Sequence, residues 1–179
     1  MIKDLLDLDI RVEKCNNCFI QRNGHNIPKW TEKTKYVMFT EFLYKNKPDF
    51  MIKFWELAGR MGLKEEHFLQ IGTVQCSPDV NKRTKKYNRP SHLHRTTCEI
   101  WFNEYLKVIK PKKMLAFGNF PMERLTGKIK GIAELNSTVI KPKINQVVVP
   151  TVLSLPPSIL IYPENEKLIK QSLKQFKEL

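Results

Sequence analysis

Four cysteines constrain the fold of this chain more than any other feature of its sequence. Cys15 and Cys18 form a C-x-x-C pair, Cys76 ends the apolar run LQIGTVQC, and Cys98 lies in a helical pattern that begins near Leu93. One centre holding all four thiolates would bring an N-terminal loop, a strand end and a helix to a single point. Thiolates are the usual protein ligands of zinc and of iron–sulfur clusters.

The spacing of the cysteines leaves three interpretations open. Structural zinc sites usually offer two close pairs of ligands, whereas 21 residues separate Cys76 from Cys98. The spacing therefore favours an iron–sulfur cluster over zinc. The third interpretation is that no metal binds, because free cysteine often packs as a small hydrophobic residue.

Length and hydropathy predict a single globular domain over residues 1–179. Hydrophobic residues make up 41% of the chain, which is enough for a substantial core in one domain of this length. No apolar run approaches the ~20 residues that span a bilayer. The first ten residues, MIKDLLDLDI, carry acids where a signal peptide would be basic. We therefore expect a cytoplasmic monomer with reduced thiols and no membrane partner.

The charge of the chain predicts a polyanionic partner. Its 31 Lys and Arg residues outweigh 18 Asp and Glu residues, for a net charge of +13. Nucleic acid is the simplest such partner, although a lysine-rich composition with solvated charge would look similar. The charge is concentrated in a basic loop, residues 77–97, whose one acid is Asp79. The candidate phosphate contacts are Lys82, Arg83, Lys85, Lys86, Arg89 and Arg95.

The hydrophobic pattern predicts an α/β fold. Apolar runs predict strands over residues 35–42, 69–76, 113–118 and 147–155. Helical spacing predicts helices over residues 2–13, 49–63 (with Asp49 as N-cap), 93–110 and 163–179, and a short helix after Gly118, whereas residues 128–146 are expected to form loops. Such alternation predicts a three-layer α/β/α sandwich around a four-stranded, mainly parallel sheet.

Ligands of parallel sheets bind beyond the carboxyl ends of the strands. The predicted ends carry Glu41, the segment 72–76, the pair Gly118–Asn119 and the segment 154–158. We expect these segments to line one site.

These strand ends and cysteines, in this order, resemble the uracil-DNA glycosylase superfamily, and specifically its iron–sulfur branch, family 4. The resemblance runs over most of the chain. The pair Cys15–Cys18 is similar to the family's N-terminal C-x-x-C, and TVQCSP (73–78) to its third cysteine segment. IKPKKMLAFGNFPMERLTG (109–127) is similar to the segment after the fourth cysteine, and LSLPPSILIYPENEKLIKQSL (153–173) to the last motif, normally H-P-S and an apolar loop. The resemblance implies a [4Fe–4S] cluster on Cys15, Cys18, Cys76 and Cys98, and DNA as partner.

The sequence departs from the family at the residues that carry out catalysis. Of the first motif, G-E-A-P-G, only Glu41 remains. Gly72 stands where the family has the asparagine that recognises the base, and Pro156 replaces the histidine of H-P-S. Proline has neither a side-chain donor nor a backbone N–H. The loop between the third and fourth cysteines is also longer than usual.

The residues that remain predict a reduced active site. Glu41 is the candidate catalytic carboxylate, which would orient water and stabilise a sugar cation. Phe50 is the candidate for stacking on an extruded base, with Phe54 a weaker one. Gly72 would open space for the base, and Thr73 and Ser158 offer hydroxyl donors. In the final loop, Ile159 and Leu160, followed by Ile161, are candidates for an apolar wedge into DNA.

Three hypotheses of function follow. The first is a monofunctional DNA glycosylase that cleaves the N-glycosidic bond of a uracil-like or modified base, in duplex or single-stranded DNA. The second is a DNA-binding homologue that keeps the cluster and has lost base excision. The third is an enzyme that acts differently on modified bases or nucleotides.

Overall fold

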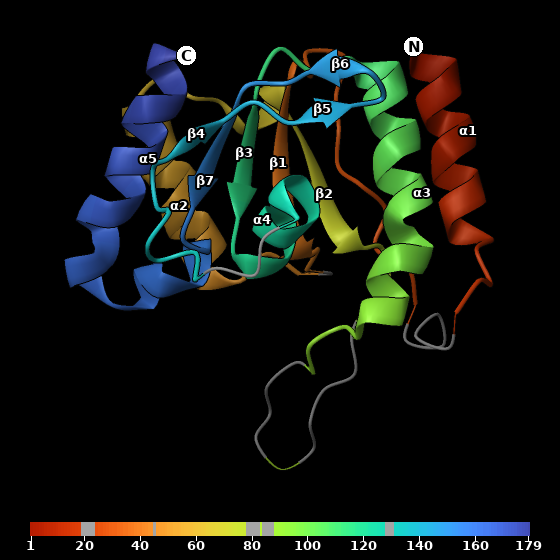
Figure 1. Cartoon of the computed structure of the whole chain (residues 1–179), viewed down its shortest axis with the longest axis horizontal. Helices are drawn as coiled ribbons and strands as arrows, with labels where there is room; N and C mark the ends of the chain where they lie inside the picture. Colours follow the sequence, from red (N-terminus) through yellow and green to blue (C-terminus); the bar gives the residue numbers. More distant parts are fainter. Residues whose placement is uncertain (19–23, 45, 78–82, 84–87, 128–130) are drawn as a thin grey trace.

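A mixed five-stranded sheet forms the centre of the molecule in the computed structural model (Figure 1). The structure describes residues 1–18, 24–44, 46–77, 83, 88–127 and 131–179. In spatial order the strands are β2 (Phe68–Val74), β1 (Tyr36–Phe42), β3 (Met114–Phe117), β7 (Thr151–Ser154) and β4 (Val139–Ile140). The first four strands run parallel, and β4 is antiparallel to β7. The fold class is therefore α/β, as the sequence predicts.

The sheet differs from the prediction at its β7 edge. Pro150 splits the segment predicted as one strand into β6 (Val147–Val148) and β7, because proline has no N–H to give to a ladder. Residues 128–146, predicted as loops, contain β4 and β5 (Lys143–Ile144). Strand β5 pairs with β6 in a separate two-stranded hairpin. The sheet thus has five strands instead of four.

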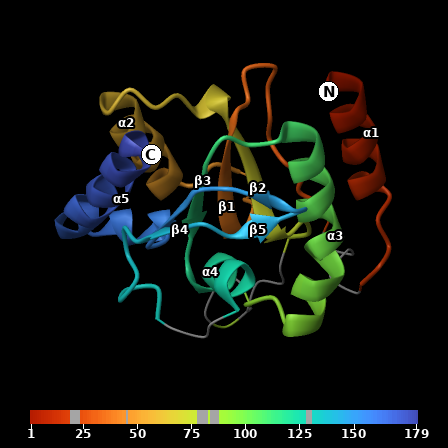
Figure 2. The ribbon, with the colours of Figure 1, turned by 45° about the horizontal axis from the view of Figure 1, so that its top comes forward.

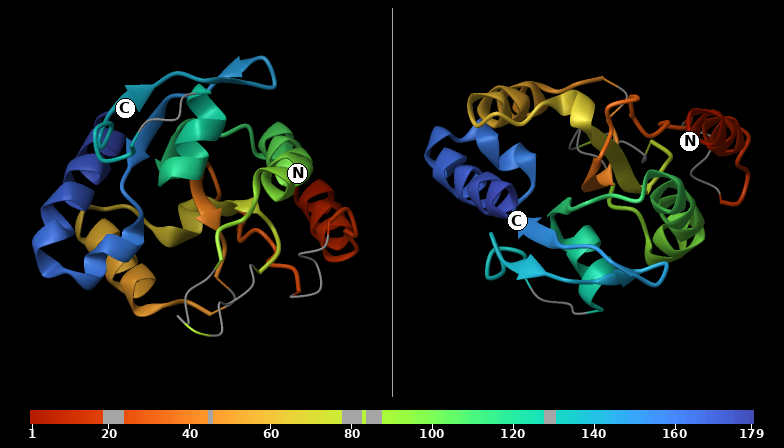
Figure 3. Two further views of the ribbon diagram at one scale, coloured as in Figure 1. Left: turned by 60° about the horizontal axis from the view of Figure 1, so that its bottom comes forward. Right: turned by 90° about the horizontal axis from the view of Figure 1, so that it is seen from above.

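Helices cover both faces of the sheet, as Figures 2 and 3 show. The helices are α1 (Ile2–Glu13), α2 (Asp49–Arg60), α3 (His92–Ile109), α4 (Asn119–Thr126) and α5 (Glu166–Glu178). Alternate β1 side chains enter two separate cores: Phe39 stacks on Phe102 of α3, whereas Met38 packs with Phe54 of α2 and Phe176 of α5. Helices α3 and α4 lie on one face, and α2 and α5 on the other (Figure 3, right).

Helix ends lie close to where the sequence places them. Ser91 caps α3, its hydroxyl accepting the His94 N–H at 3.3 Å. Helix α3 stops before Pro111, and the left-handed Gly127 closes α4. The prediction of Asp49 as an N-cap is wrong: Pro48 holds that position and Asp49 is the first helical residue. No helix in the described part of the chain is long and apolar enough to cross a membrane.

Helix α1 packs beside α3 instead of on the sheet (Figure 1). Asp9 of α1 holds this arrangement by accepting two hydrogen bonds, one from the Tyr105 hydroxyl of α3 and one from Trp30 Nε1 at 3.0 Å. Tyr105 is fully buried. This contact fixes the end of α1, from which the C-x-x-C pair continues.

The strand order creates a crevice at one edge of the sheet. The chain passes from β1 through α2 to β2 on one side, and from β3 through α4 onward to β7 on the other side. The connections therefore leave in opposite directions from the carboxyl ends of β1 and β3, which is the position where open α/β sheets bind ligands. Glu41 near the end of β1 and Gly118 after β3 come together there.

Short segments cover both edges of the sheet. At the β2 edge, Lys29 and Gln70 exchange backbone hydrogen bonds of 3.1 and 2.8 Å. At the β7 edge, the Leu153 N–H donates to the Thr138 carbonyl at 2.9 Å and the Ser137 N–H donates to the Leu153 carbonyl at 2.8 Å. Segments outside the four parallel strands thus satisfy backbone groups on β2 and β7, the outer two of those four strands.

Gly72 has no room for a side chain. It lies in β2 opposite Thr40, and a Cβ at this position would come within 2.6 Å of the Val74 carbonyl oxygen and 2.9 Å of the Phe42 Cα. Both neighbours are backbone atoms, so they cannot rotate away. The expectation that Gly72 opens space for a base is therefore wrong, because backbone already fills the space around this residue.

We predict that Gly72→Ala lowers the free energy of unfolding by about 1–3 kcal/mol through overpacking. Gly59→Ala is the matched control, because nothing lies within 4 Å of a Cβ there and alanine favours a helix by up to about 1 kcal/mol. Urea denaturation of the two variants measures the difference. Equal stabilities would contradict the packing described for β2.

Candidate functional site

A cleft of about 580 Å³ opens beyond the carboxyl ends of β1, β3 and β7. It contains parts of four segments that the sequence keeps far apart. Its lining includes Glu41, Phe50 of α2, the turn Gly118–Asn119, and residues 156–159 after β7. The cleft therefore lies at the crevice that the strand order creates, and we treat it as the candidate active site.

Glu41 is held at the start of α4. The backbone N–H groups of Asn119 and Phe120 lie near its carboxyl and favour the charged form, which lowers its pKa. Free N–H groups of a first helical turn favour a negative charge. Burial nevertheless raises the pKa of Glu41 above its ordinary value, because the charged form loses water, while Arg89, the two N–H groups and Arg95 oppose this rise. The site thus contains an oriented carboxylate in a partly desolvated environment.

Gly118 makes room for this carboxylate. A Cβ at Gly118 would lie 3.0 Å from Glu41 Oε1 and 3.3 Å from Glu41 Cγ. The residue also has a φ of 88°, a conformation that favours glycine. Both the close approach of Glu41 and the turn into α4 therefore require glycine here.

Aromatic rings form one wall of the cleft. Tyr44 packs edge-on against Phe42 and Phe50, with ring centroids 5.0 and 5.3 Å apart. Phe50 is half-buried and lines the cleft. Phe54, the weaker candidate, is 1% exposed and packs on Trp55 in the core. A planar ligand could therefore meet Phe50 or Tyr44, but not Phe54.

Of the other predicted base contacts, one lines the cleft and the others lie outside it. Ser158 lines the cleft. Thr73 instead lines a neighbouring cavity, and its hydroxyl donates to the Glu41 carbonyl oxygen at 2.5 Å. Gly72 is buried in β2. Thr73 therefore supports the backbone of Glu41, whereas Ser158 is placed to touch a ligand.

The exposed apolar residues of the final loop lie further along the chain than the predicted wedge. Leu160 is 5% exposed and packs in the core between α2 and α5, so it is not available to DNA. Ile159 is half-buried and lines the cleft. Ile161 and Tyr162 are the exposed members, at 56% and 57%, and both line the cleft. The apolar rim thus consists of Ile161 and Tyr162.

The structure places the predicted DNA contacts of the basic loop in different surroundings. Lys82, Lys85 and Lys86 lie outside the described residues. Arg83 is exposed. Arg89 is exposed and lines the cleft. Arg95 is engaged elsewhere: it pairs with Glu123 at 2.7 Å, and its guanidinium lies 4.0 Å from the centre of the Phe120 ring.

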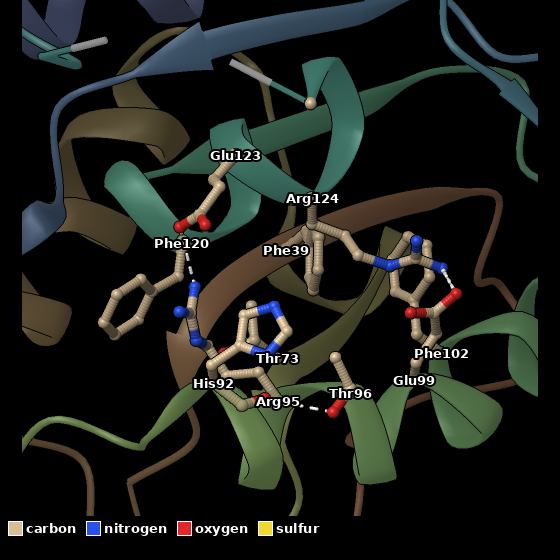
Figure 4. A pocket seen from close by; sticks show the side chains of 11 residues that line it. Phe39, Thr73, His92, Arg95, Thr96, Glu99, Phe102, Phe120, Glu123 and Arg124 are labelled. Atoms are coloured by element: carbon tan, nitrogen blue, oxygen red, sulfur yellow. Dashed lines mark hydrogen bonds and ion pairs between the residues drawn. The ribbon is translucent and has the colours of Figure 1, made fainter. Parts of the chain in front are cut away.

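A second cavity, of about 290 Å³, lies between α3 and α4 (Figure 4). Two ion pairs cross it in opposite senses: Arg95 of α3 meets Glu123, and Arg124 of α4 meets Glu99 at 2.6 Å. The stacked rings of Phe39 and Phe102, 4.2 Å apart, line the same cavity. These contacts fix α4 against α3, and so they fix the N–H groups that hold Glu41.

The four cysteines come from the elements that the sequence predicts. Cys98 lies in α3, Cys76 follows β2, and Cys15 and Cys18 follow α1. A backbone bridge between His25 and Cys76 ties the segment after the C-x-x-C pair to the end of β2, and His25 Nε2 lies 2.9 Å from the Cys15 carbonyl oxygen. Cys76 and Cys98 are buried, and Cys15 and Cys18 are partly exposed.

The four thiols influence one another. Burial raises the pKa of Cys76 to about 12 and that of Cys98 to about 11, and the neighbouring thiols Cys15 and Cys18 add to both shifts. The Gln75 N–H opposes the shift at Cys98. As free thiols, Cys76 and Cys98 are therefore protonated at neutral pH. Within the described ranges, no three His, Cys, Asp or Glu side chains are grouped so as to hold a metal ion.

Sequence reasoning assigns no role to several residues of the cleft, among them Asn119 and Tyr44. Asn119 directly follows Gly118, where the chain turns from β3 into a helix, and this position is a signal for it. Tyr44 lies two residues after a strand, which gives no clear signal. Neither protein-family models nor curated proteins give a match to this chain.

We predict that Arg89→Ala raises the pKa of Glu41 further, because the arginine is the strongest of the influences that lower it. The measurement is a carbon-13 NMR titration of the Glu41 carboxyl, assigned by its loss in Glu41→Gln. Arg60→Ala removes the same charge from the far end of α2 and is expected to leave the titration unchanged. An unchanged Glu41 titration in Arg89→Ala would contradict the proximity of the two groups.

Proposed function

We propose that this chain is a monofunctional DNA glycosylase of the uracil-DNA glycosylase type, related to the iron–sulfur branch of that superfamily. The observation that carries the proposal is the position of Glu41, which is the residue retained from the first motif. It lies at the switch point of the sheet, in a cleft with an aromatic wall. The volume of about 580 Å³ is in the range of small-ligand sites, about 300–1,000 Å³.

The proposed reaction is hydrolysis of the bond between the base and C1′ of the deoxyribose. The C1′–N bond breaks, and its electron pair leaves with the base. Water adds to C1′ and gives its proton to Glu41, while the departing base takes up a proton from solvent. The products are the free base and an abasic sugar. Glu41 suits the role of base, since it lies in the cleft beside the Asn119 and Phe120 N–H groups and burial raises its pKa above the ordinary value.

The walls of the cleft support a flipped nucleotide. Phe50 and Tyr44 offer ring faces or edges to an extruded base. Ser158 offers a hydroxyl from the opposite loop. Ile161 and Tyr162 form an exposed apolar rim that would fill the space the base leaves. Arg89 in the same cleft, with Lys82, Arg83, Lys85 and Lys86 of the basic loop, would contact phosphates.

We further propose that Cys15, Cys18, Cys76 and Cys98 hold a [4Fe–4S] cluster. The donor set fits, because all four groups are thiols and both Cys15 and Cys18 act on the pKa values of Cys76 and Cys98. Each cysteine of such a cluster binds a different iron, so the four sulfurs need not converge on a single point as they do around zinc. The cluster would be structural: it would join α1, the end of β2 and α3, and thereby support the base of the basic loop.

A DNA-binding homologue without catalysis is the second candidate, and one feature favours it. Pro156 lines the cleft where the family has a histidine donor, and proline supplies no hydrogen bond there. In this alternative the net charge of +13 and the cleft bind DNA, but the base is never released.

We expect the protein to form abasic sites in oligonucleotides that carry uracil, hypoxanthine, xanthine or 5-hydroxymethyluracil. Glu41→Gln should lower the single-turnover rate by about 100-fold or more, since it removes the general base. Glu56→Gln makes the same change at an exposed position of α2 and serves as control. Salt-sensitive DNA binding with no excision of any of these bases would favour the silent homologue.

We expect protein purified without oxygen to be brown, with absorbance at about 400 nm and iron and sulfide in equal amounts. Replacing any one of the four cysteines by serine should reduce both the absorbance and the melting temperature, because α1 and α3 lose a common anchor. Zinc in place of iron, or four variants as stable as the parent, would contradict the cluster.

A further inference from the structure

Asn119 carries an amide group whose direction is fixed. It is the first residue of α4 and lines the cleft, and its backbone N–H is one of the groups that lower the pKa of Glu41. Its side-chain Oδ1 accepts the backbone N–H of Ile132 at 2.9 Å. Ile132 is buried and lines the same cleft. The side chain of this asparagine is therefore held by the Ile132 N–H, and its backbone is held in the first turn of α4, beside the proposed catalytic group.

The hydrogen bond to Ile132 determines which atom of this amide, Oδ1 or Nδ2, is left to bind a ligand. A backbone N–H can only donate, so the atom that faces Ile132 must be the oxygen and not the nitrogen. The Nδ2 group, with its two N–H donors, is then the free end. Among the described residues, the hydrogen bond of this side chain is the one that Oδ1 accepts from Ile132. Asn119 is half-buried and lines the cleft, so Nδ2 is left for a ligand there.

The other polar groups of the cleft are less suited to select a base. The Thr40 hydroxyl already donates to the Phe42 carbonyl oxygen at 3.1 Å. The Ser158 hydroxyl can rotate to donate or to accept, so it does not discriminate. Arg89 is exposed on the basic loop. Asn119, in contrast, presents donors only, in one orientation, on the rigid start of a helix.

We propose that Asn119 recognises the extruded base, donating from Nδ2 to an exocyclic oxygen, and that the substrates are therefore bases with an oxo group at this edge. This inference rests on the proposed glycosylase function and names its substrate class. Uracil, hypoxanthine and xanthine present such an oxygen. Cytosine and adenine present an amino group at the corresponding position, which places donor against donor. A site with fixed, desolvated donors rejects the wrong partner strongly, because its own groups are left unpaired.

The same contact would also assist the reaction. When the C1′–N bond breaks, negative charge spreads onto the oxygen atoms of the departing base. A donor already aimed at such an oxygen stabilises that charge without rearrangement. Asn119 would thus supply, from the start of α4, part of what Pro156 cannot supply from the loop after β7.

The test compares uracil with cytosine in the same oligonucleotide, using the wild type and Asn119→Asp. The aspartate keeps an oxygen for the Ile132 N–H but replaces the Nδ2 donors by an acceptor. We expect the wild type to excise uracil at least about 100-fold faster than cytosine, and the variant to reduce this ratio by about 10-fold or more. The ratio is the informative quantity, because a new charge beside Glu41 alters the rates for both bases together.

Asn46→Asp is the matched control, since it adds the same charge at an exposed residue outside the cleft lining. It should leave the ratio unchanged. If the wild type excises uracil and Asn119→Asp keeps the wild-type ratio, the role of Asn119 is overturned while the proposed function stands.

A binding measurement separates this inference from the failure of catalysis. If the wild type excises no base, the proposed function fails, but recognition is still tested by titrating free uracil or free cytosine into nitrogen-15-labelled protein. We expect uracil, and not cytosine, to shift the Asn119 side-chain NH₂ signals, with a loss of that response in Asn119→Asp. The absence of a shift with uracil, or equal shifts with both bases, would overturn the inference.

Discussion

The parallel pairing of β1 with β3 is the contact on which the cleft depends. Val37, Met38 and Phe39 pair with Met114, Leu115 and Ala116, and this register sets the ends of the two strands side by side. Because β1 continues into α2 on one face and β3 continues into α4 on the other, nothing from these two strands fills the space between their ends. Glu41 reaches across this gap to the first turn of α4, and the second cavity shows why that turn does not move: reciprocal ion pairs hold α4 to α3.

Burial of the charged Glu41 carboxylate lowers the stability of the folded protein. Burial raises its pKa, so the folded protein prefers the protonated form more than the unfolded chain does. The contribution of this group to stability therefore declines as the pH rises through the folded-state pKa. The N–H groups of Asn119 and Phe120 reduce this cost without removing it. A buried acid of this kind, with its direction fixed and its charge only partly balanced, is typical of catalytic positions.

Much of the framework could be predicted from the sequence. The apolar runs locate β1, β2, β3 and β7 because fully buried parallel strands are almost continuously hydrophobic, as FLQIGTV in β2 illustrates. Glu41, Gly118 and Ser158 were found for the same reason, since each follows a strand that ends in the cleft. Two-residue strands such as β4 carry no periodicity, so they could not be predicted.

Side-chain contacts across elements were beyond sequence reasoning. The sequence predicts Arg95 as a phosphate contact, whereas its partner Glu123, 28 residues away, holds it between two helices. The sequence predicts Leu160 as part of a surface wedge, but it is the member of its loop that turns into the core. A glycine at position 72 predicts open space because glycine has no side chain, whereas backbone atoms of β1 and β2 occupy that space. In each case the partner lies in another segment, and local pattern carries no information about it.

The way in which the sheet ends at its two sides has a consequence for behaviour at high concentration. An outer strand with unpaired backbone groups is a template on which a second chain can add, and it is a common origin of aggregation. In the described part of this chain, Lys29 occupies the outer side of β2 at Gln70, and residues 137–140 occupy the outer side of β7. Neither covering segment is long enough to form a strand of more than two residues. Each therefore pairs with part of a strand and offers only a short edge of its own, and the net charge of +13 adds mutual repulsion between copies.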